Sequence, residues 1–227
     1  MLTMIYYCIW DHSIPSHDLL RRAAKKYLVT GDAAASRLVL YPDIDPGIDS
    51  EINPEVEPVI NPVIDSVQDW EIAEHDGGKP YFPEHPEIHF SISHSGEYWA
   101  CAIASKEVGL DLQEENATAR ARKLAKRFFH PHEQAYLKSV DYRAFTRIWA
   151  AKESYLKYTG EGIAGGMSHF SVVDEDGRFA LRGSEAELTF AAQTVIPFDK
   201  DYKMVLTTAN NTEYRTEVLR LKDCQKN

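Results

Sequence analysis

The pattern that decides the fold is Val108-Gly109-Leu110-Asp111-Leu112-Gln113. Apolar and polar residues alternate along it, and successive side chains of a β-strand point to opposite faces. We therefore expect a strand in which Leu110 and Leu112 point into a core. Asp111 and Gln113 would then share the other face.

A second stretch, Trp149-Ala150-Ala151-Lys152-Glu153-Ser154-Tyr155-Leu156-Lys157, predicts a helix. Residues four apart share one face of a helix, so Trp149, Glu153 and Lys157 form one stripe. If this stripe packs against the polar face of the strand, carboxylates and a lysine meet at one place. Mg²⁺ prefers carboxylate and phosphate oxygens, so the two segments together indicate magnesium-assisted chemistry at a phosphate. Each segment alone has an ordinary interpretation, as a solvated ion pair or as a turn.

The composition limits the class of protein. The chain has 227 residues, enough for one large domain or two small ones. Its net charge of −10 argues against a nucleic-acid surface. Its three cysteines, Cys8, Cys101 and Cys224, are widely spaced and favour a reduced, cytoplasmic setting. We expect no membrane span and no signal peptide, because the apolar start lacks basic residues and is short.

The first part of the chain predicts a strand over residues 3–10 and a helix over 16–28 that Ser16 could cap. The buried side of this helix would carry Leu19, Leu20, Ala23 and Tyr27. A second helix is expected over 32–40. Residues 42–65 contain five prolines and no Lys or Arg, so we expect an irregular acidic excursion without a long helix or a central strand.

The rest of the chain mixes strands and helices. Strands are predicted over residues 68–74, 89–93, 98–104 and 108–112, and again over 170–173, 186–192, 203–208 and 215–219. Helices are predicted over 118–129, 131–139 and 142–158, with Pro131 in a first turn and Gly160 ending the last one. The fold class is therefore α+β. We divide the chain into an N-terminal half, 1–106, and a C-terminal half, 107–227.

Three further segments carry chemistry of weaker specificity. Gly77-Gly78-Lys79-Pro80-Tyr81 is a turn in which glycine allows close backbone approach and lysine suits phosphate. Ser93-His94 ends a strand in a turn rich in hydrogen-bond donors, but adjacent strand residues face opposite ways, so His94 is poorly placed to activate Ser93. A basic helix is either a solvated face or a docking surface for an acidic partner. Its cations are Arg120, Arg122, Lys123, Lys126 and Arg127.

Read in order, these segments resemble the larger, single-chain 4′-phosphopantetheinyl transferases of the Sfp type. The resemblance rests on Gly78-Lys79-Pro80, Ser93-His94, Gly109-Leu110-Asp111 and the complete helix motif from Trp149 to Lys157. The match spans roughly residues 79–170 with order and spacing preserved, and four ordered segments are far more specific than any one. The resemblance implies two similar α/β halves related by a pseudo-twofold axis, with coenzyme A bound between them, and a monomer.

The implied reaction moves phosphopantetheine from coenzyme A to a serine of an apo acyl or peptidyl carrier protein. The resemblance implies that Asp111 and Glu153 hold Mg²⁺, that Glu153 is the base directly or through a water, and that Lys157 stabilises charge at the phosphoryl group. Further residues are expected to bind coenzyme A. They are Lys79, Pro80, Ser93, His94 and Asp111, with Arg22, Lys25 and Lys26 as candidates for the 3′-phosphate.

One position departs from the family pattern. Many relatives have a glutamate two residues after the strand aspartate, whereas this chain has Gln113. We expect Gln113 to be a weaker or water-mediated metal ligand. Three rival functions follow: a coenzyme A-binding protein without catalysis, a magnesium-dependent phosphohydrolase, and a structural interaction domain. The complete helix motif favours the transferase.

Overall fold

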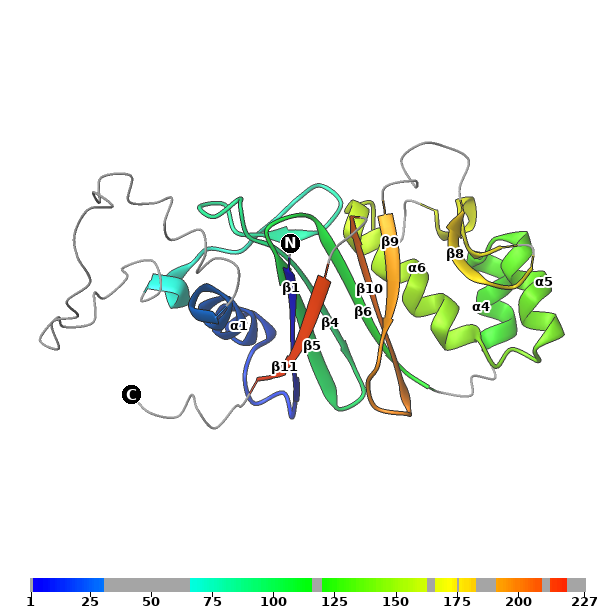
Figure 1. The fold of residues 1–227 in the computed structure, drawn as a ribbon, viewed down its shortest axis with the longest axis horizontal. Coiled ribbons are helices and arrows are strands. Elements are labelled where there is room, and N and C mark those ends of the chain that lie inside the picture. The colour runs from blue at the N-terminus through cyan, green and yellow to red at the C-terminus, as the bar shows by residue number, and fades with distance from the viewer. Residues whose placement is uncertain are drawn as a thin grey trace, which may run out of the picture.

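The structure is a computed structural model that describes residues 2–30, 66–115, 120–162, 166–174, 176–182, 191–209 and 213–219. Its elements follow one another as layers along the long axis of the molecule (Figure 1). Helix α1 lies at one end, followed by a first sheet, a second sheet and helix α6, and two shorter helices lie at the other end. The expected α+β content is confirmed.

The first sheet has four strands in the order β11-β1-β5-β4. Their bounds are β1 Leu2–Ile9, β4 His89–Ser95, β5 Tyr98–Ala104 and β11 Glu213–Val218. The β11 strand pairs parallel with β1, and the other pairs are antiparallel. Helix α1, Ser16–Thr30, covers one face of this sheet. As expected, the buried side of α1 carries Leu19, Leu20, Ala23 and Tyr27.

The second sheet has three antiparallel strands in the order β6-β10-β9. Their bounds are β6 Val108–Glu114, β9 Ala191–Ile196 and β10 Tyr202–Ala209. Its inner face packs on the first sheet through Leu110, Leu112 and Met204, which meet Ala100 and Ala102 of β5. Its outer face packs on α6, Phe145–Thr159. Alternation along β6 and β10 thus separates two cores, one between the sheets and one under α6.

Smaller elements complete the two ends. Helices α4, Ala121–Phe128, and α5, Pro131–Ser139, pack with the hairpin of β7, Ser171–Val173, and β8, Phe179–Arg182. The 3-10 helix η3, Met167–His169, precedes β7. The 3-10 helix η1, Val67–Asp69, packs on α1. The short pair of β2, Ala73–Glu74, and β3, Pro80–Tyr81, lies beside β4.

A row of serines joins the two sheets. Ser91, Ser93 and Ser95 alternate along β4, so their hydroxyls share one face of that strand. They accept hydrogen bonds of 2.9–3.0 Å from the backbone N–H groups of Leu110, Leu112 and Glu114 on β6. Side chains thereby satisfy the edge of the second sheet where no backbone ladder reaches it. This places β4 beside β6 and fixes their register.

Two expected strands differ from the structure. Residues 68–74 were expected to form one strand, but they contain the end of η1 and only the two-residue β2. Trp70 is buried, and its carbonyl accepts from the side chain of Arg21 on α1, so it does not join a ladder. The strand expected over 186–192 is β9, which extends to Ile196, while residues 183–190 lie outside the described part.

The helix expected from residue 142 begins at Phe145. Asp141 and Tyr142 have positive φ angles of 49° and 60°, which form a turn and delay the helix. The helix expected from residue 118 begins at Ala121, and residues 116–119 lie outside the described part. The helix expected over 32–40 and the acidic excursion over 42–65 also lie outside it.

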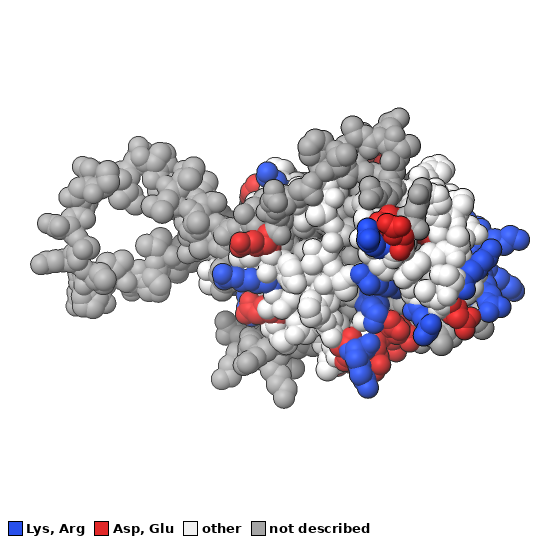
Figure 2. Space-filling view, turned by 45° about the vertical axis from the view of Figure 1, so that its right-hand side comes forward, with Lys and Arg blue, Asp and Glu red and all other residues white. Residues whose placement is uncertain are grey.

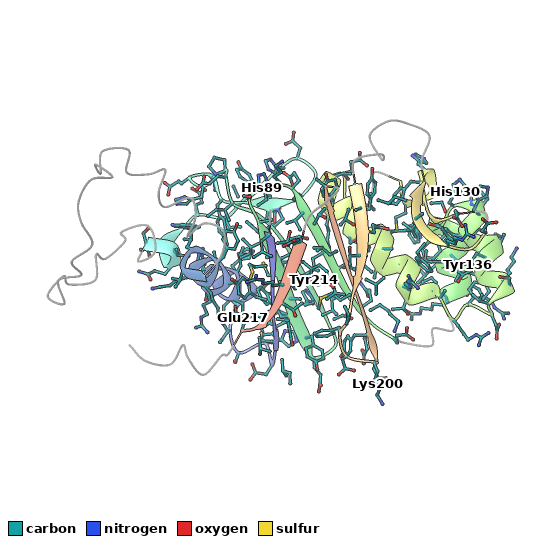
Figure 3. The ribbon with its side chains drawn as sticks, in the orientation of Figure 1. His89, His130, Tyr136, Lys200, Tyr214 and Glu217 are labelled. Atoms are coloured by element: carbon teal, nitrogen blue, oxygen red, sulfur yellow. The ribbon has the colours of Figure 1, made fainter. Side chains whose placement is uncertain are left out.

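The division at residues 106 and 107 falls in the turn between β5 and β6. The last strand, β11, returns to the first sheet, and Glu217 on it pairs with Lys26 of α1 beside it (Figure 3). The first sheet therefore contains strands from both halves of the chain. No helix among the described residues is long and apolar enough to cross a membrane.

Candidate functional site

Asp111 is the buried centre of the candidate site. It is 2 % exposed and lies on the face of β6 opposite to Leu110 and Leu112, as its strand position predicts. Its Oδ1 accepts from the Ser93 hydroxyl at 2.9 Å and from Lys157 Nζ at 2.7 Å. Its Oδ2 accepts from Gln113 Nε2 at 2.9 Å. Three donors from three elements hold this carboxylate in place.

Helix α6 brings two further charged groups to this place. Glu153 and Lys157 lie one turn apart on it, as their spacing predicts. Lys157 donates to Asp111 and also, at 3.2 Å, to the carbonyl of Ile92 on β4. The structure therefore brings Asp111, Gln113 and Lys157 into direct contact, with Glu153 close enough for the charge of Asp111 to act on it.

The close approach of α6 to β6 depends on Gly109. A Cβ at that position would overlap the carbonyl oxygen of Ser154 and crowd Tyr158. The helix is also tied to β9 and β10, because Gln193 Nε2 donates to the carbonyl of Ala151 at 2.6 Å and to Thr207 Oγ1 at 3.1 Å. The Ser154 and Thr207 hydroxyls are 2.6 Å apart. These contacts fix the position of α6 next to Asp111 of β6.

The electrostatics at Glu153 differ from those of an ordinary glutamate. Burial raises its pKa, the charge of Asp111 raises it further, and Lys157 opposes both, so the pKa is about 7. Glu153 is only 9 % exposed. A second negative charge is therefore costly in this site unless a cation joins it.

A cavity of about 190 Å³ opens beside these residues. Glu153, Lys157 and Leu156 of α6 form one wall, and Phe90–Ile92 of β4 form another. The turn from Gly77 to Pro80 and the glycines that follow α6 complete the lining. The cavity thus adjoins the strand, helix and turn that the sequence singled out, and its charged lining includes two lysines and one acid.

Lys79 lines this cavity, but its ammonium group is engaged by the protein. It pairs with Glu107 and donates to the carbonyls of Tyr158, at 3.1 Å, and Val108, at 3.3 Å. Pro80, next to it, lines the same cavity. The turn is therefore where the sequence placed it, while its lysine contacts the last turn of α6.

Ser93 and His94 diverge as expected for neighbours on a strand. The Ser93 hydroxyl donates to Asp111 and accepts from the N–H of Leu112, so it positions the carboxylate. His94 is exposed on the other face, where its ring lies 5.3 Å from that of Trp10. Neither arrangement is that of a serine activated by a histidine.

The three basic candidates for the 3′-phosphate, Arg22, Lys25 and Lys26, lie on α1. Lys26 pairs with Glu217, and Nη1 of Arg22 is buried. Lys25 is exposed. None of these three is among the residues that line the cavity.

The basic residues of α4 are exposed, and Figure 2 shows basic side chains gathered at the end of the molecule where α4 lies. The exposure of these basic side chains agrees with both interpretations of the helix, a solvated face and a docking surface.

Three contributors to the site were not predicted: Glu107, Gln193 and the pair of Ser91 with Ser95. The alternation of serines around Ser93 is a signal that could have indicated the row that joins the sheets. Glu107 and Gln193 carry no local signal, because their partners are 28 and 42 residues away in the chain. Only the tertiary fold brings these groups together.

The donors at the site suit a hard divalent cation. The carboxylate of Asp111 accepts from Gln113 and acts electrostatically on the carboxylate of Glu153. Mg²⁺ prefers such oxygen ligands, with water and phosphate completing its shell. The repulsion that raises the pKa of Glu153 is the kind that a cation relieves. Among the described residues, no group of three or more His, Cys, Asp and Glu side chains could hold a metal, and here the third position is an amide.

Comparison with known families agrees with the resemblance inferred from the sequence motifs. Residues 107–207 match the model of the 4′-phosphopantetheinyl transferase superfamily. This segment contains β6, α6 and the carboxylates described above. The family resemblance inferred from the sequence is confirmed.

Comparison with individual proteins gives relatives in bacilli. The chain is 34 % identical to a 4′-phosphopantetheinyl transferase of Bacillus subtilis over 59 % of this chain and 60 % of the relative. It is 32 % identical to 4′-phosphopantetheinyl transferase Sfp of Bacillus subtilis strain 168, over 63 % and 64 %. It is 35 % identical to 4′-phosphopantetheinyl transferase psf-1 of Bacillus pumilus, over 60 % of each. These matches cover somewhat less than two thirds of the relatives.

Proposed function

We propose that this chain, whose residues 107–207 belong to the 4′-phosphopantetheinyl transferase superfamily, transfers phosphopantetheine from coenzyme A to a serine of an apo acyl or peptidyl carrier protein. The products are the holo-carrier and adenosine 3′,5′-bisphosphate. The curated relatives are named for this activity, and the match to this chain covers about 60 % of their length. We further propose that the two halves of the chain are related by a pseudo-twofold axis.

One observation carries the proposal. Lys157 and Glu153 of α6 line a cavity while contacting or adjoining the buried carboxylate of β6. Acids and a cation at the wall of one cavity suit a pyrophosphate, because they combine a place for a divalent cation with a fixed positive charge. The same two elements carry the family motifs, so local chemistry and family membership support the same reaction.

Asp111 and Glu153 would hold Mg²⁺, and Gln113 would contribute more weakly. When bound, Mg²⁺ would neutralise charge on the pyrophosphate oxygens. Gln113 brings no charge, and its amide N–H group donates to Asp111, so its second task is to orient that carboxylate. The protein supplies the rest of the orientation through the Ser93 hydroxyl.

The carrier serine hydroxyl attacks the phosphorus that bears pantetheine. Its proton passes to Glu153, directly or through a water, and the bond from that phosphorus to the bridging oxygen breaks. The bridging oxygen leaves with adenosine 3′,5′-bisphosphate. Lys157 stabilises negative charge on the transferring group, and its contacts with Asp111 and the Ile92 carbonyl aim its ammonium group.

Coenzyme A would occupy the cavity and extend from it. Pro80 lines the cavity wall, and His94 is exposed on the neighbouring strand, where it can meet a phosphate. Arg22, Lys25 and Lys26 remain candidates for the 3′-phosphate. The monomeric state and the cytoplasmic location stay predictions.

The test incubates the purified chain with coenzyme A and Mg²⁺, with and without apo-carriers of the fatty-acid, polyketide and nonribosomal-peptide classes. The transferase reading expects adenosine 3′,5′-bisphosphate and holo-carrier in equal amounts, and only when a carrier is present. Consumption of coenzyme A without a carrier would indicate the phosphohydrolase. Binding without consumption would indicate the binding protein, and no binding would indicate the interaction domain.

A further inference from the structure

The side chain of Lys79 connects three segments that are distant in sequence. It extends from the hairpin of β2 and β3, where the N–H of His75 donates to its carbonyl at 3.0 Å. Its ammonium group reaches Glu107 and the Val108 carbonyl at the start of β6, and the Tyr158 carbonyl in the last turn of α6. The Lys79 nitrogen thus connects the hairpin with β6, which bears the buried carboxylate, and with the end of α6.

The ammonium group of Lys79 has three N–H donors, and the structure gives it three acceptors. Its side chain is only 13 % exposed. The carbonyl of Tyr158 belongs to the C-terminal end of α6, where cations interact favourably with the helix dipole. A phosphate could gain a bond from this nitrogen only at the expense of one of these contacts.

Glu107 is itself held from two sides. One carboxylate oxygen pairs with Lys79, and the other lies 3.0 Å from Nδ1 of His89, the first residue of β4 (Figure 3). Burial would raise the pKa of Glu107, but the hydrogen bonds and charges of His89 and Lys79 outweigh it and hold the pKa at about 2. The carboxylate of Glu107 is therefore ionised at neutral pH.

The backbone of the hairpin also fits closely against the end of α6. A Cβ at Gly77 would overlap the carbonyl oxygen of Gly160, the residue that caps α6 with a φ of 78°. Gly77 and Gly160 both line the cavity, as do Lys79 and Pro80. The position of the hairpin relative to α6 therefore sets the width of the cavity at this wall.

We propose that Lys79 and Glu107 form a clamp that positions the hairpin wall of the cavity against the end of α6. Lys79 and Glu107 are positioning residues for coenzyme A, and Lys79 makes no contact with its phosphates. The choice of coenzyme A as the ligand rests on the proposed function, whereas the clamp itself does not. It replaces the direct phosphate contact that the family resemblance implies for Lys79.

The clamp is tested first without any ligand. Thermal unfolding is measured for the wild type, Lys79→Met, Glu107→Gln and the double variant, with Lys106→Met, an exposed neighbour, as control. We expect each clamp variant to lower Tm by about 2–4 °C, the double variant to lower it by clearly less than the sum, and the control to leave it unchanged. Additive losses, or no loss in either single variant, would overturn the clamp.

Coenzyme A then separates the clamp from a phosphate contact. If Lys79 positions the wall, Lys79→Met and Glu107→Gln each weaken coenzyme A binding by about five-fold or more. The double variant then binds coenzyme A no more weakly than the single variant with the lower affinity. If Lys79 were a phosphate ligand restrained by Glu107, Glu107→Gln would free it and tighten binding. That opposite sign would overturn the proposal.

Steady-state kinetics distinguish positioning from general damage. Lys157 and Glu153 keep their own contacts in both variants, so we expect KM for coenzyme A to rise by about five-fold or more while kcat stays within about two-fold. A lower kcat with unchanged KM would mean loss of folded protein and would contradict positioning. If the wild type binds no coenzyme A, the proposed function fails, whereas the unfolding measurements still decide the clamp.

Discussion

Replacing Glu153 by glutamine removes a buried carboxylate whose pKa the fold raises to about 7 from an ordinary value of 4.5. An acid with a raised pKa in the folded state makes the protein less stable as pH increases, because the unfolded chain loses this proton first. The loss begins near the unfolded value of 4.5 and ends above the folded value of about 7. Glutamine has no proton to lose, so Glu153→Gln removes this dependence.

The magnitude follows from the same two values. One pKa unit corresponds to about 1.4 kcal/mol, so between pH 5.5 and 8.5 the wild type loses about 2 kcal/mol relative to Glu153→Gln. Most of this change falls between pH 5.5 and 7, and the difference then levels off. Groups that do not interact with Glu153 titrate alike in both proteins, so they cancel in the comparison.

The assay is urea unfolding of both proteins from pH 5.5 to 8.5 with a chelator present. Glu161→Gln, an exposed glutamate shortly after α6, is the matched control and is expected to follow the wild type at every pH. A constant difference between Glu153→Gln and the wild type across this range would refute the reasoning, because it would mean that the fold does not perturb the carboxylate.

Three further predictions concern the frame of the site. Lys152→Met should lower the free energy of unfolding by about 3–5 kcal/mol, because it leaves Glu133, its fully buried partner at 2.8 Å, without a counter-charge; urea unfolding at pH 7 measures this, and a loss below 1 kcal/mol would contradict it. Gly109→Ala should cost about 2 kcal/mol or more and also lower kcat, because the added Cβ meets Ser154 and displaces α6; calorimetry and rate measurements on one sample decide it, and an unchanged Tm counts against it. Gln113→Glu should lower the Mg²⁺ concentration needed for half-maximal activity and Gln113→Ala should raise it, by about three-fold or more; if neither changes it, Gln113 is outside the metal shell.

The alternation and spacing of the two motif segments predicted the inner part of the site. Period two placed Asp111 opposite to Leu110 and Leu112, and the four-residue spacing placed Glu153 and Lys157 on one face of α6. These are local rules, so a single sequence suffices for them. Direct contact between β6 and α6 is tertiary, and the family resemblance supplied it.

Other features could not be predicted because they depend on distant partners. The strand expected over residues 68–74 was wrong, since Trp70 turns its side chain into the core beside α1 and its carbonyl binds Arg21. Nothing in the local sequence marks Glu107 as a partner of Lys79. The return of β11 to the first sheet is likewise set by pairing with β1 across the whole chain.

The central claim is that α6 carries out group transfer to a carrier protein, and intact-mass measurement of the carrier tests it most directly. An apo-carrier is incubated with coenzyme A, Mg²⁺ and either the wild type or Glu153→Ala, after folding of both proteins has been checked. We predict that the wild type adds one phosphopantetheine to each carrier and that Glu153→Ala adds none at the same time point. An unmodified carrier with the wild type, across all three carrier classes and with coenzyme A bound, would contradict the account.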